Sequence, residues 1–417
     1  MTEGGARRIM DVAAMEDQAA ARGARAAGTA PTAVIAPTHG WDSTVRVSSH
    51  HLALALAKRG WRVFFLSTPV SPWHALLRRS DLAVREKLAA SRRGLVDDGS
   101  GVLSIVPTTL LPHTYRWPFK APFSLRNWQR FASPNLKRLL ARNGALEPEL
   151  LVVDNVVMAW LLQALRPKKS VYRITDHYAS FSTTTPSMRA AERQFAPEVD
   201  MVVYTADSLK AYAQSLAPKA SLLLDHGIDA DVFDQADLTL PEAYEKIPEP
   251  RAVFVGVIGE WFDVQAVNAM AERLPEVSFV MVGPDQGPGA GFADRRNLHV
   301  LGPKPRSAVP ALLHHAAVGL IPFDRAGKPE LVDGINPLKL YEYLISGLPV
   351  VTTAWPELER LEAPVIACGT PQDFPDAVLR ALGGEGPDLA ARTTFARQAD
   401  WQARIGELLK ALDLENA

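Results

Sequence analysis

The chain has 417 residues, of which 47% are hydrophobic and 22% are charged, and its formal net charge at pH 7 is -1. This composition is typical of a folded globular protein and excludes disordered and fibrous classes. Because one hydrophobic core rarely keeps growing to this length, two domains are expected. The near-neutral charge gives no overall attraction to nucleic acid, and the single cysteine, Cys368, excludes an internal disulfide framework.

The sequence indicates neither a membrane span nor a secretion signal. No stretch approaches the roughly 20 apolar residues that a membrane-spanning helix needs, and the N-terminus lacks the apolar core of a signal peptide. A cytoplasmic location is therefore expected. Residues 1–30 are rich in Ala, Arg and Gly without a sustained apolar face, and they predict a disordered leader.

Apolar runs alternate with helical segments from residue 31 onward. Residues 33–36, 45–58 and 62–66 form an apolar run, a helical segment and a second apolar run, which is a β-α-β pattern. Such runs of Val, Ile and Leu are typical of parallel strands buried on both faces. The segment 31–230 therefore predicts a Rossmann-like N-terminal domain, with further strands at 103–106, 150–153, 171–174, 201–204 and 221–224.

A change in composition then separates two domains. Residues 231–250 replace the periodic pattern with prolines and scattered charges, and they predict a linker. Residues 251–385 predict a second Rossmann-like domain, and residues 386–417 predict a helix that packs across the junction. The expected fold is α/β, with two doubly wound domains facing across a cleft in which ligands bind at the carboxyl ends of the strands. Strands of the second domain are expected at 252–255, 279–282, 298–301, 318–322, 349–352 and 365–367.

A helix with a ligand-binding start is predicted within residues 335–351. Asn336 can cap a helix that begins with Pro337 and Leu338, and Gly347 suits its end. The N-terminus of such a helix, placed at the cleft, offers free N–H groups and a partial positive charge. Both features suit a diphosphate.

Two charged side chains lie on the first turns of this helix. Lys339 and Glu342 are three residues apart and share one face, so the cation can contact phosphates while the carboxylate accepts hydrogen bonds from ribose hydroxyls. A solvated ion pair on an ordinary helix is the alternative interpretation. Gly256 and Gly259, which follow the strand at 252–255, would let the backbone approach the same ligand closely.

These motifs resemble a known family. The stretch GINPLKLYEYLISGLPVV, which contains Lys339 and Glu342, resembles the donor-binding helix of the GT-B superfamily of glycosyltransferases, in a subgroup that includes teichuronic acid and exopolysaccharide transferases. FVGVIGEWFD from Phe254 and NLHVLGPKP from Asn297 are similar to other strand ends of that family, and YRITDHYASF from Tyr172 is similar more loosely. The resemblance implies GT-B architecture, an N-terminal acceptor domain and a C-terminal nucleotide-sugar donor domain.

The implied activity is transfer of a sugar from a nucleoside-diphosphate sugar, by resemblance a UDP-sugar, to a lipid-linked saccharide in cell-surface polysaccharide synthesis. Many retaining relatives carry another Glu eight residues before the one that corresponds to Glu342. At that position this chain has Gly334, with Asp333 beside it. The pattern is closer to the xanthan glucuronosyltransferase, which is inverting. The family holds the diphosphate without a metal, so no metal ion or other cofactor is expected. A nucleotide-sugar 2-epimerase of the same fold and a non-catalytic nucleotide-sugar or lipid-binding protein are the alternatives.

An inverting transfer needs a base that takes a proton from the acceptor hydroxyl. Asp176 is the expected base, because it follows a predicted strand at the end where catalytic groups gather; a helix-capping role is the alternative. His177 and Asp42 are the reserve candidates, although Asp42 could equally form a turn. Asp229 and Asp231 spell a metal-binding Asp-x-Asp, but they fall in the predicted linker and are rejected as a metal site.

Residues 99–146 contain no Asp or Glu, and their basic residues are interleaved with aromatic ones. Such a surface suits anionic lipid, and it predicts a peripheral location on the inner face of the plasma membrane. Packing into the core is an alternative interpretation. Single-stranded nucleic acid is another, but no nucleic-acid fold signature supports it, and no nucleic acid is expected as a partner. The surface is predicted to include Arg116, Trp117, Lys120, Arg126, Trp128 and Arg130.

Overall fold

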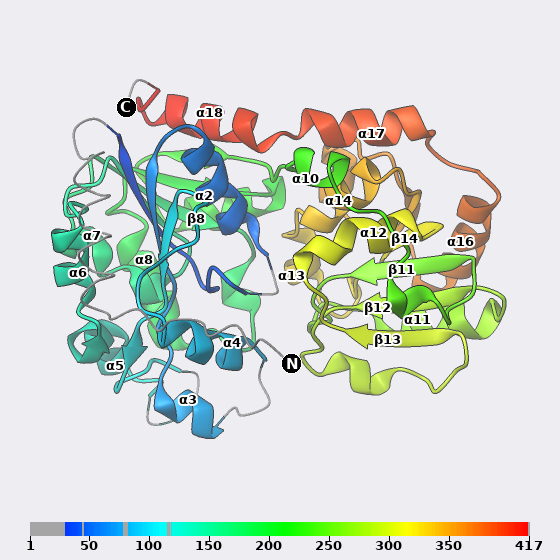
Figure 1. Cartoon of the computed structure of the whole chain (residues 1–417), viewed down its shortest axis with the longest axis horizontal. Helices are drawn as coiled ribbons and strands as arrows, with labels where there is room; N and C mark the ends of the chain where they lie inside the picture. Colours follow the sequence, from blue (N-terminus) through cyan, green and yellow to red (C-terminus); the bar gives the residue numbers. More distant parts are fainter. Residues whose placement is uncertain (1–29, 44–45, 78–81, 115–116, 118, 416–417) are drawn as a thin grey trace, which may run out of the picture.

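The computed structural model of the chain describes residues 30–43, 46–77, 82–114, 117 and 119–415. It consists of two α/β halves that lie side by side (Figure 1). The predicted leader falls outside the described residues, except for residue 30. Within the described ranges, no helix combines the length and the apolar character that crossing a bilayer requires.

An eight-stranded sheet forms the N-terminal half, in the order β10-β9-β8-β7-β1-β2-β4-β3. Only β3, at the edge, is antiparallel to its neighbour. The strand order reverses between β1 and β7, and a reversal of this kind leaves a crevice at the carboxyl ends of the strands. The strands are β1 (Thr32–Ala36), β2 (Arg62–Leu66), β3 (Val96–Asp97), β4 (Val102–Ile105), β7 (Leu150–Val153), β8 (Lys169–Ile174), β9 (Met201–Tyr204) and β10 (Ser221–Leu223).

Apolar clusters lie on both faces of this sheet because strands such as β1 are buried along their whole length. A small ribbon of β5 (Thr108–Thr109) and β6 (Ala132–Ser133) stands apart from the sheet. The helices of this half are α2 (Ser48–Lys58), α3 (Pro72–Leu77), α4 (Leu82–Ser91), α5 (Pro122–Asn127), α6 (Leu136–Arg142), α7 (Leu161–Ala164), α8 (Pro186–Phe195) and α9 (Lys210–Ser215).

A six-stranded parallel sheet forms the C-terminal half, in the order β13-β12-β11-β14-β15-β16, which reverses between β11 and β14. Its strands are β11 (Arg251–Val255), β12 (Ser278–Val282), β13 (Leu298–Gly302), β14 (Val318–Ile321), β15 (Val350–Thr353) and β16 (Ile366–Cys368). Its helices are α11 (Val264–Arg273), α12 (Val309–His314), α13 (Pro329–Asp333), α14 (Leu338–Ile345), α15 (Pro356–Arg360) and α16 (Phe374–Leu382). The two sheets confirm the predicted fold class of two doubly wound α/β units.

The segment between the sheets is more ordered than a plain linker. It contains α10 (Asp231–Asp234) and a 3₁₀ turn at Glu242–Tyr244. Tyr244 is buried in an apolar cluster of the C-terminal half. Phe233 and Ile247 are buried in the same cluster, so residues 231–250 pack onto the C-terminal half through three apolar side chains.

The last two helices bridge the two halves (Figure 1). α17 (Leu389–Gln398) packs against α14, and α18 (Trp401–Ala411) packs against α2. The chain passes between the halves twice, near residue 228 and again between α17 and α18. The two segments lie side by side, since the Ile228 amide donates to the Ala399 carbonyl. Gly227 permits this approach, because a Cβ there would lie 2.9 Å from the Ala399 carbonyl oxygen.

Candidate functional site

The N-terminus of α14 faces the N-terminal half. The helix begins at Leu338 after Pro337, and no side chain in the described part of the chain caps it. Leu338 packs against an apolar cluster of the N-terminal half, which places the first turn of α14 at the boundary between the halves. Gly347 adopts a φ of +79° directly after the helix, as predicted for its end. The free N–H groups of α14 are therefore directed to the boundary.

Asn336 does not cap this helix, contrary to the sequence-based prediction. Its side-chain amide donates to the Thr205 carbonyl at 3.0 Å and accepts from the Tyr341 hydroxyl at 3.0 Å. Its backbone carbonyl lies 2.7 Å from Nδ1 of the buried His226. Asn336 is buried, and its contact with Thr205 joins the C-terminal half to the N-terminal half. Its side chain is therefore not available to cap α14.

Lys339 occupies the crevice where the C-terminal sheet reverses its strand order. Its Nζ lies 5.1 Å from the ring centroids of both Phe254, on β11, and Phe323, just after β14. Burial lowers the pKa of Lys339 to about 8, against the opposing effects of Glu342 and Asp176. A partly desolvated ammonium at a helix N-terminus is a strong site for an anion.

Glu342 lies one turn further along α14 and is buried. Its carboxylate forms an ion pair with Arg306, which follows β13. Arg306 was not among the residues predicted for the site, although its position directly after the GPKP stretch is a signal that could have indicated it. A carboxylate has lone pairs for more than one donor, so Glu342 can accept from hydroxyls while it keeps this arginine.

Gly256 and Gly259 leave room for side chains of the protein itself. A Cβ at Gly256, which has a φ of +151°, would lie 2.9 Å from Cε of Lys339. At Gly259 it would lie 2.6 Å from Cη2 of Trp261. The Trp261 ring meets Phe181 of the other half edge to face, with centroids 6.0 Å apart. The glycines therefore position Lys339 and an aromatic contact across the boundary.

Asp176 enters the site from the opposite half, just after β8. Burial raises the pKa of Asp176 to about 6, against the effects of the Thr175 hydrogen bond, Arg173 and Lys339. The Thr175 hydroxyl donates to Asp176 Oδ2 at 3.0 Å. Asp176 directly precedes His177, whose backbone nitrogen would lie 3.5 Å from a Cβ at Gly334, and Leu338 beside Lys339 packs on the N-terminal half. Asp176 and Lys339 therefore approach the boundary from opposite halves, and each shifts the pKa of the other. This arrangement combines an anion-binding cation with a carboxylate whose pKa suits a general base.

Buried polar contacts fix the strand that carries Asp176. Arg173 on β8 donates to Asp154 at 2.9 Å and 3.0 Å, and its Nη2 also contacts Ser49. Asp154 follows β7 and Ser49 lies in the first turn of α2, so three elements meet at the reversal point of the N-terminal sheet. Buried charges are tolerated here because they are paired.

The two reserve candidates have other partners. Nδ1 of His177 contacts the Ser180 hydroxyl and lies 3.9 Å from Glu330 of α13. Asp42 forms an ion pair with Arg93 and is about half exposed. His177 is thus close to the boundary between the halves, whereas Asp42 belongs to an ion pair within the N-terminal half.

Gly334 fits tightly against the N-terminal half. A Cβ there would lie 3.0 Å from Leu209 and 3.5 Å from the backbone nitrogen of His177. Asp333, its neighbour, pairs with Arg325 at 2.7 Å. This arrangement leaves little room at position 334 for a glutamate side chain, the residue expected there in retaining relatives.

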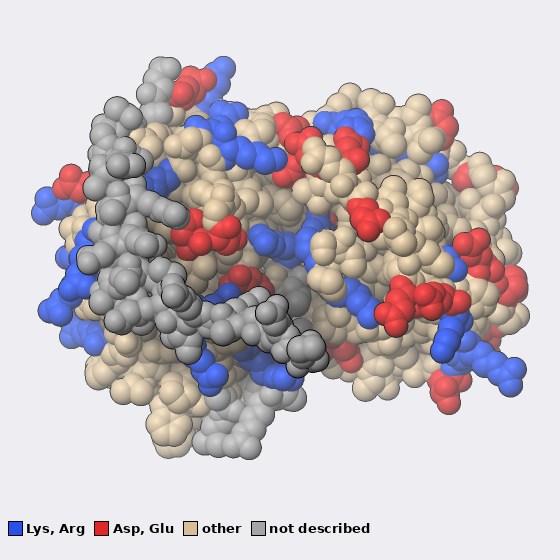
Figure 2. All heavy atoms as spheres, viewed as in Figure 1, with Lys and Arg blue, Asp and Glu red and all other residues tan. Residues whose placement is uncertain are grey.

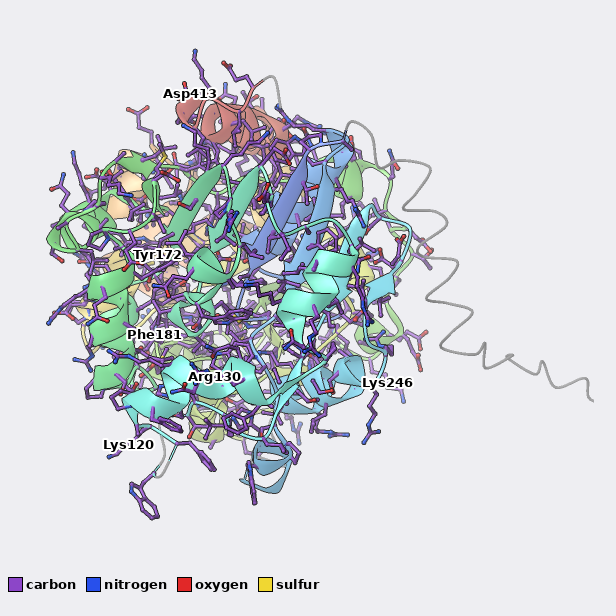
Figure 3. All side chains as sticks on the ribbon, turned by 90° about the vertical axis from the view of Figure 1, so that its left-hand side faces the viewer. Lys120, Arg130, Tyr172, Phe181, Lys246 and Asp413 are labelled. Carbon is purple, nitrogen blue, oxygen red and sulfur yellow. The ribbon has the colours of Figure 1, made fainter. Side chains whose placement is uncertain are left out.

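The basic and aromatic segment is partly a surface and partly core. Trp128 is a correction to the predicted surface: it is fully buried, and its indole N–H donates to the Val157 carbonyl at 2.8 Å. Arg116 lies outside the described residues. Trp117 is 82% exposed, and Lys120 and Arg130 lie at the same end of the N-terminal half (Figure 3). Other exposed members of this surface are Arg126, Trp73, Leu110, Phe123 and Phe131.

Across the described ranges, no group of three or more His, Cys, Asp or Glu side chains is arranged to hold a metal ion. Asp229 and Asp231 of the Asp-x-Asp sequence instead lie beside Lys58, at 2.9 Å and 3.8 Å from its Nζ. These ion pairs connect α2 with the segment that joins the two halves.

Comparison with known proteins gives the class of this chain. Residues 35–205 match the family of the N-terminal domain of glucuronosyltransferase GumK, and residues 249–383 match group 1 glycosyl transferases. Each half therefore matches a glycosyltransferase family, and the fold agrees with the GT-B class that the resemblance in the sequence indicated.

Within this class, the chain is related to exopolysaccharide-type transferases. It is 29% identical over 167 residues to TuaH of Bacillus subtilis, a putative teichuronic acid biosynthesis glycosyltransferase; the match spans 38% of this chain and 41% of that relative. Sucrose-phosphate synthase of Thermosynechococcus elongatus has the same fold (TM-score 0.61, 16% identity, 92% of this chain and 97% of the other). So does HepE of Anabaena, solved with UDP and glucose (TM-score 0.61, 12% identity, 92% and 99%).

Proposed function

We propose that this chain transfers a sugar from a nucleoside-diphosphate sugar to a saccharide acceptor, with inversion at the anomeric carbon. The supporting observation is that Lys339, in the first turn of α14, and Asp176, at the end of β8, come to the boundary from opposite halves, where Leu338 packs on the N-terminal half and Gly334 lies against His177. The two side chains also influence each other's pKa. One side chain is suited to a leaving diphosphate and the other to an attacking hydroxyl.

The proposed reaction needs a single displacement. Asp176 accepts the proton of the acceptor hydroxyl while its oxygen attacks the anomeric carbon of the donor. The bond between that carbon and the diphosphate oxygen breaks on the opposite face, and its electron pair leaves with the diphosphate. Lys339 and the N–H groups at the start of α14 stabilise the charge that develops there. Because the pKa of Asp176 is about 6, its carboxylate is mostly ionised at pH 7.

UDP is the proposed nucleoside diphosphate. The Anabaena relative of the same fold was solved with UDP and glucose, and the N-terminal half matches a glucuronosyltransferase family. Glu342 is the proposed ribose ligand. We propose that the reaction needs no metal ion or other cofactor, because Lys339 and the partial positive charge of α14 offer positive charge to the diphosphate.

The acceptor is proposed to be lipid-linked, and the protein to act at the cytoplasmic face of the plasma membrane in cell-surface polysaccharide synthesis. Exposed basic residues such as Lys120, Arg126 and Arg130 lie among exposed aromatic ones, including Trp117 and Phe123. This combination suits the headgroup region of an anionic membrane. A lipid-anchored acceptor would reach the site from the same half that carries Asp176.

The test is a panel of nucleotide sugars, screened by thermal stabilisation of the protein and by slow donor hydrolysis with and without EDTA. A cognate donor should stabilise the fold by mass action. Asp176→Asn should then abolish transfer while donor binding remains, and Lys339→Ala should lower UDP affinity at least tenfold. Persistence of turnover in Asp176→Asn would exclude the proposed base, and unchanged UDP affinity in Lys339→Ala would exclude the proposed donor site.

The same panel separates the alternatives. Release of a 2-epimerised nucleotide sugar without any acceptor would indicate an epimerase. Donor binding without hydrolysis, transfer or epimerisation, unchanged in Asp176→Asn, would indicate a binding protein. Loss of activity in EDTA, restored by a divalent cation, would contradict the metal-independent mechanism.

A further inference from the structure

The loop before α2 contains an arginine, Arg46, to which the proposed reaction assigns no role. Arg46 lies between β1 and α2, and its guanidinium carbon is 4.8 Å from the ring centroid of Trp41. Its Nη1 atom is buried and has no hydrogen-bond partner within the described residues. A buried N–H of a charged group is costly to leave unpaired, so an acceptor from outside the protein is expected here.

A second cation lies opposite Arg46 on the C-terminal half. Arg306 pairs with Glu342 of α14, and its guanidinium carbon is 5.7 Å from the ring centroid of Phe233. Burial lowers the pKa of Arg46, and Arg306 is the next largest cause, ahead of the opposing effects of two aspartates. Two like charges from different halves are therefore near enough to repel each other. Figure 2 shows Lys and Arg side chains gathered where the two halves meet.

Asp42 and Asp98, the two acids that act on Arg46, have other partners, whereas Glu342 pairs with Arg306. Asp42 pairs with Arg93, and Asp98 accepts the indole N–H of Trp41 at 2.7 Å. His51, in the first turn of α2, adds no negative charge; burial, followed by Arg306, lowers its pKa well below the usual value. The site therefore brings two guanidinium groups close to the helix that carries Lys339.

We propose that Arg46 binds the diphosphate of the donor together with Arg306, so that side chains from both halves hold the leaving group. This inference rests on the proposed function. Arg306 has five N–H donors, so it can keep Glu342 and still reach a phosphate oxygen. The Nη1 atom of Arg46 gives up no hydrogen bond to a described residue in doing so, and the bound anion offsets the repulsion between the two guanidinium groups.

The test is calorimetric titration of the full-length chain with UDP and with uridine, which lacks phosphate. Arg46→Gln should weaken UDP binding about tenfold to a hundredfold, the range for a lost charge-assisted hydrogen bond, and should leave uridine binding unchanged. The control is Arg166→Gln in the same half, because the Arg166 side chain is 87% exposed and pairs with Glu147 at 3.8 Å. It should change neither affinity.

The melting temperature without ligand distinguishes binding from a structural role. Since Arg46 is repelled by Arg306 and its Nη1 is unpaired, Arg46→Gln should melt at the wild-type temperature or above it. A lower melting temperature, or equal losses of UDP and uridine affinity, would overturn the inference.

Comparison with Lys339→Ala separates this inference from the proposed function. If Lys339→Ala loses UDP affinity while Arg46→Gln retains it, the role of Arg46 is refuted and the donor site stands. If neither variant loses affinity, or if the wild-type chain binds no UDP, both proposals fail.

Discussion

Thr175 should control the pH at which the proposed transfer begins. Thr175→Val removes the hydroxyl that donates to Asp176 Oδ2 at 3.0 Å and keeps the shape of the side chain. A hydrogen bond to a charged group contributes about 1.5–3 kcal/mol, and one pKa unit corresponds to about 1.4 kcal/mol. Its loss should raise the pKa of Asp176 by roughly 1 to 2 units, starting from about 6.

The direction of the effect follows from the role of the base. Only the ionised carboxylate accepts a proton, so activity is present above the pKa of Asp176 and is lost as the pH falls through it. The acid limb of kcat/KM should therefore lie near pH 6 in the wild type. In Thr175→Val it should move to roughly pH 7–8.

The assay is the pH dependence of kcat/KM with the cognate donor. Thr175→Ser is the matched control, because it keeps the hydroxyl and should keep the wild-type limb. An acid limb that stays near pH 6 in Thr175→Val would refute the assignment of this limb to Asp176.

Three further predictions concern the donor site, the C-terminal helices and the exposed surface. UDP affinity should fall up to tenfold per pH unit above about pH 8, because burial lowers the pKa of Lys339 to about 8 and only its protonated form attracts phosphate; titration calorimetry across pH measures this. Trp401→Ala should lower the free energy of unfolding by about 3–5 kcal/mol in urea denaturation, since the ring is buried. Replacing Lys120, Arg126 and Arg130 by Gln should weaken binding to phosphatidylserine vesicles roughly a hundredfold in low-salt sedimentation, at about 1 kcal/mol per cation.

Each of these predictions has a control. Lys339→Ala should bind UDP weakly and without the dependence above pH 8. Trp73→Ala, at an exposed tryptophan, should leave the unfolding free energy nearly unchanged. Gln at the exposed positions Lys246, Arg273 and Arg380 should leave vesicle binding intact. UDP affinity of the wild type that stays constant above pH 8 would contradict the first prediction. Wild-type stability of Trp401→Ala, or wild-type vesicle binding of the triple variant, would contradict the other two.

The sequence predicted the fold well because its strands are buried on both faces. Runs such as 150–153 and 201–204 are wholly apolar, and the structure places β7 and β9 at those residues. The strands that were missed, β3, β5 and β6, have two residues each, so they are too short to show a periodic pattern. Helix α14 was also recognisable, since Pro337 before its first residue and Gly347 after its end are local signals, although Asn336 is not its cap.

The contacts between the halves were not predictable from local patterns. Asn336 is a residue type that often caps helices. Here its side-chain amide instead donates to the carbonyl of Thr205, which is distant in sequence, and accepts from the hydroxyl of the buried Tyr341. Trp128 belongs to a basic and aromatic segment, but its ring fills the core beneath it. The pair of Arg46 and Arg306 arises only when the two halves meet, so no spacing in the sequence could indicate it.

The path of the final helix has a consequence for biosynthesis. α18 is made after both sheets, but its residues Trp401, Ile405 and Leu408 complete an apolar cluster of the N-terminal half. A nascent chain that still lacks these residues exposes the matching surface of α2, whatever the order in which the sheets form. The N-terminal half therefore reaches its final packing only after α18 has left the ribosome. Loss of residues 401–417 should damage the N-terminal half, although that half is far from them in sequence.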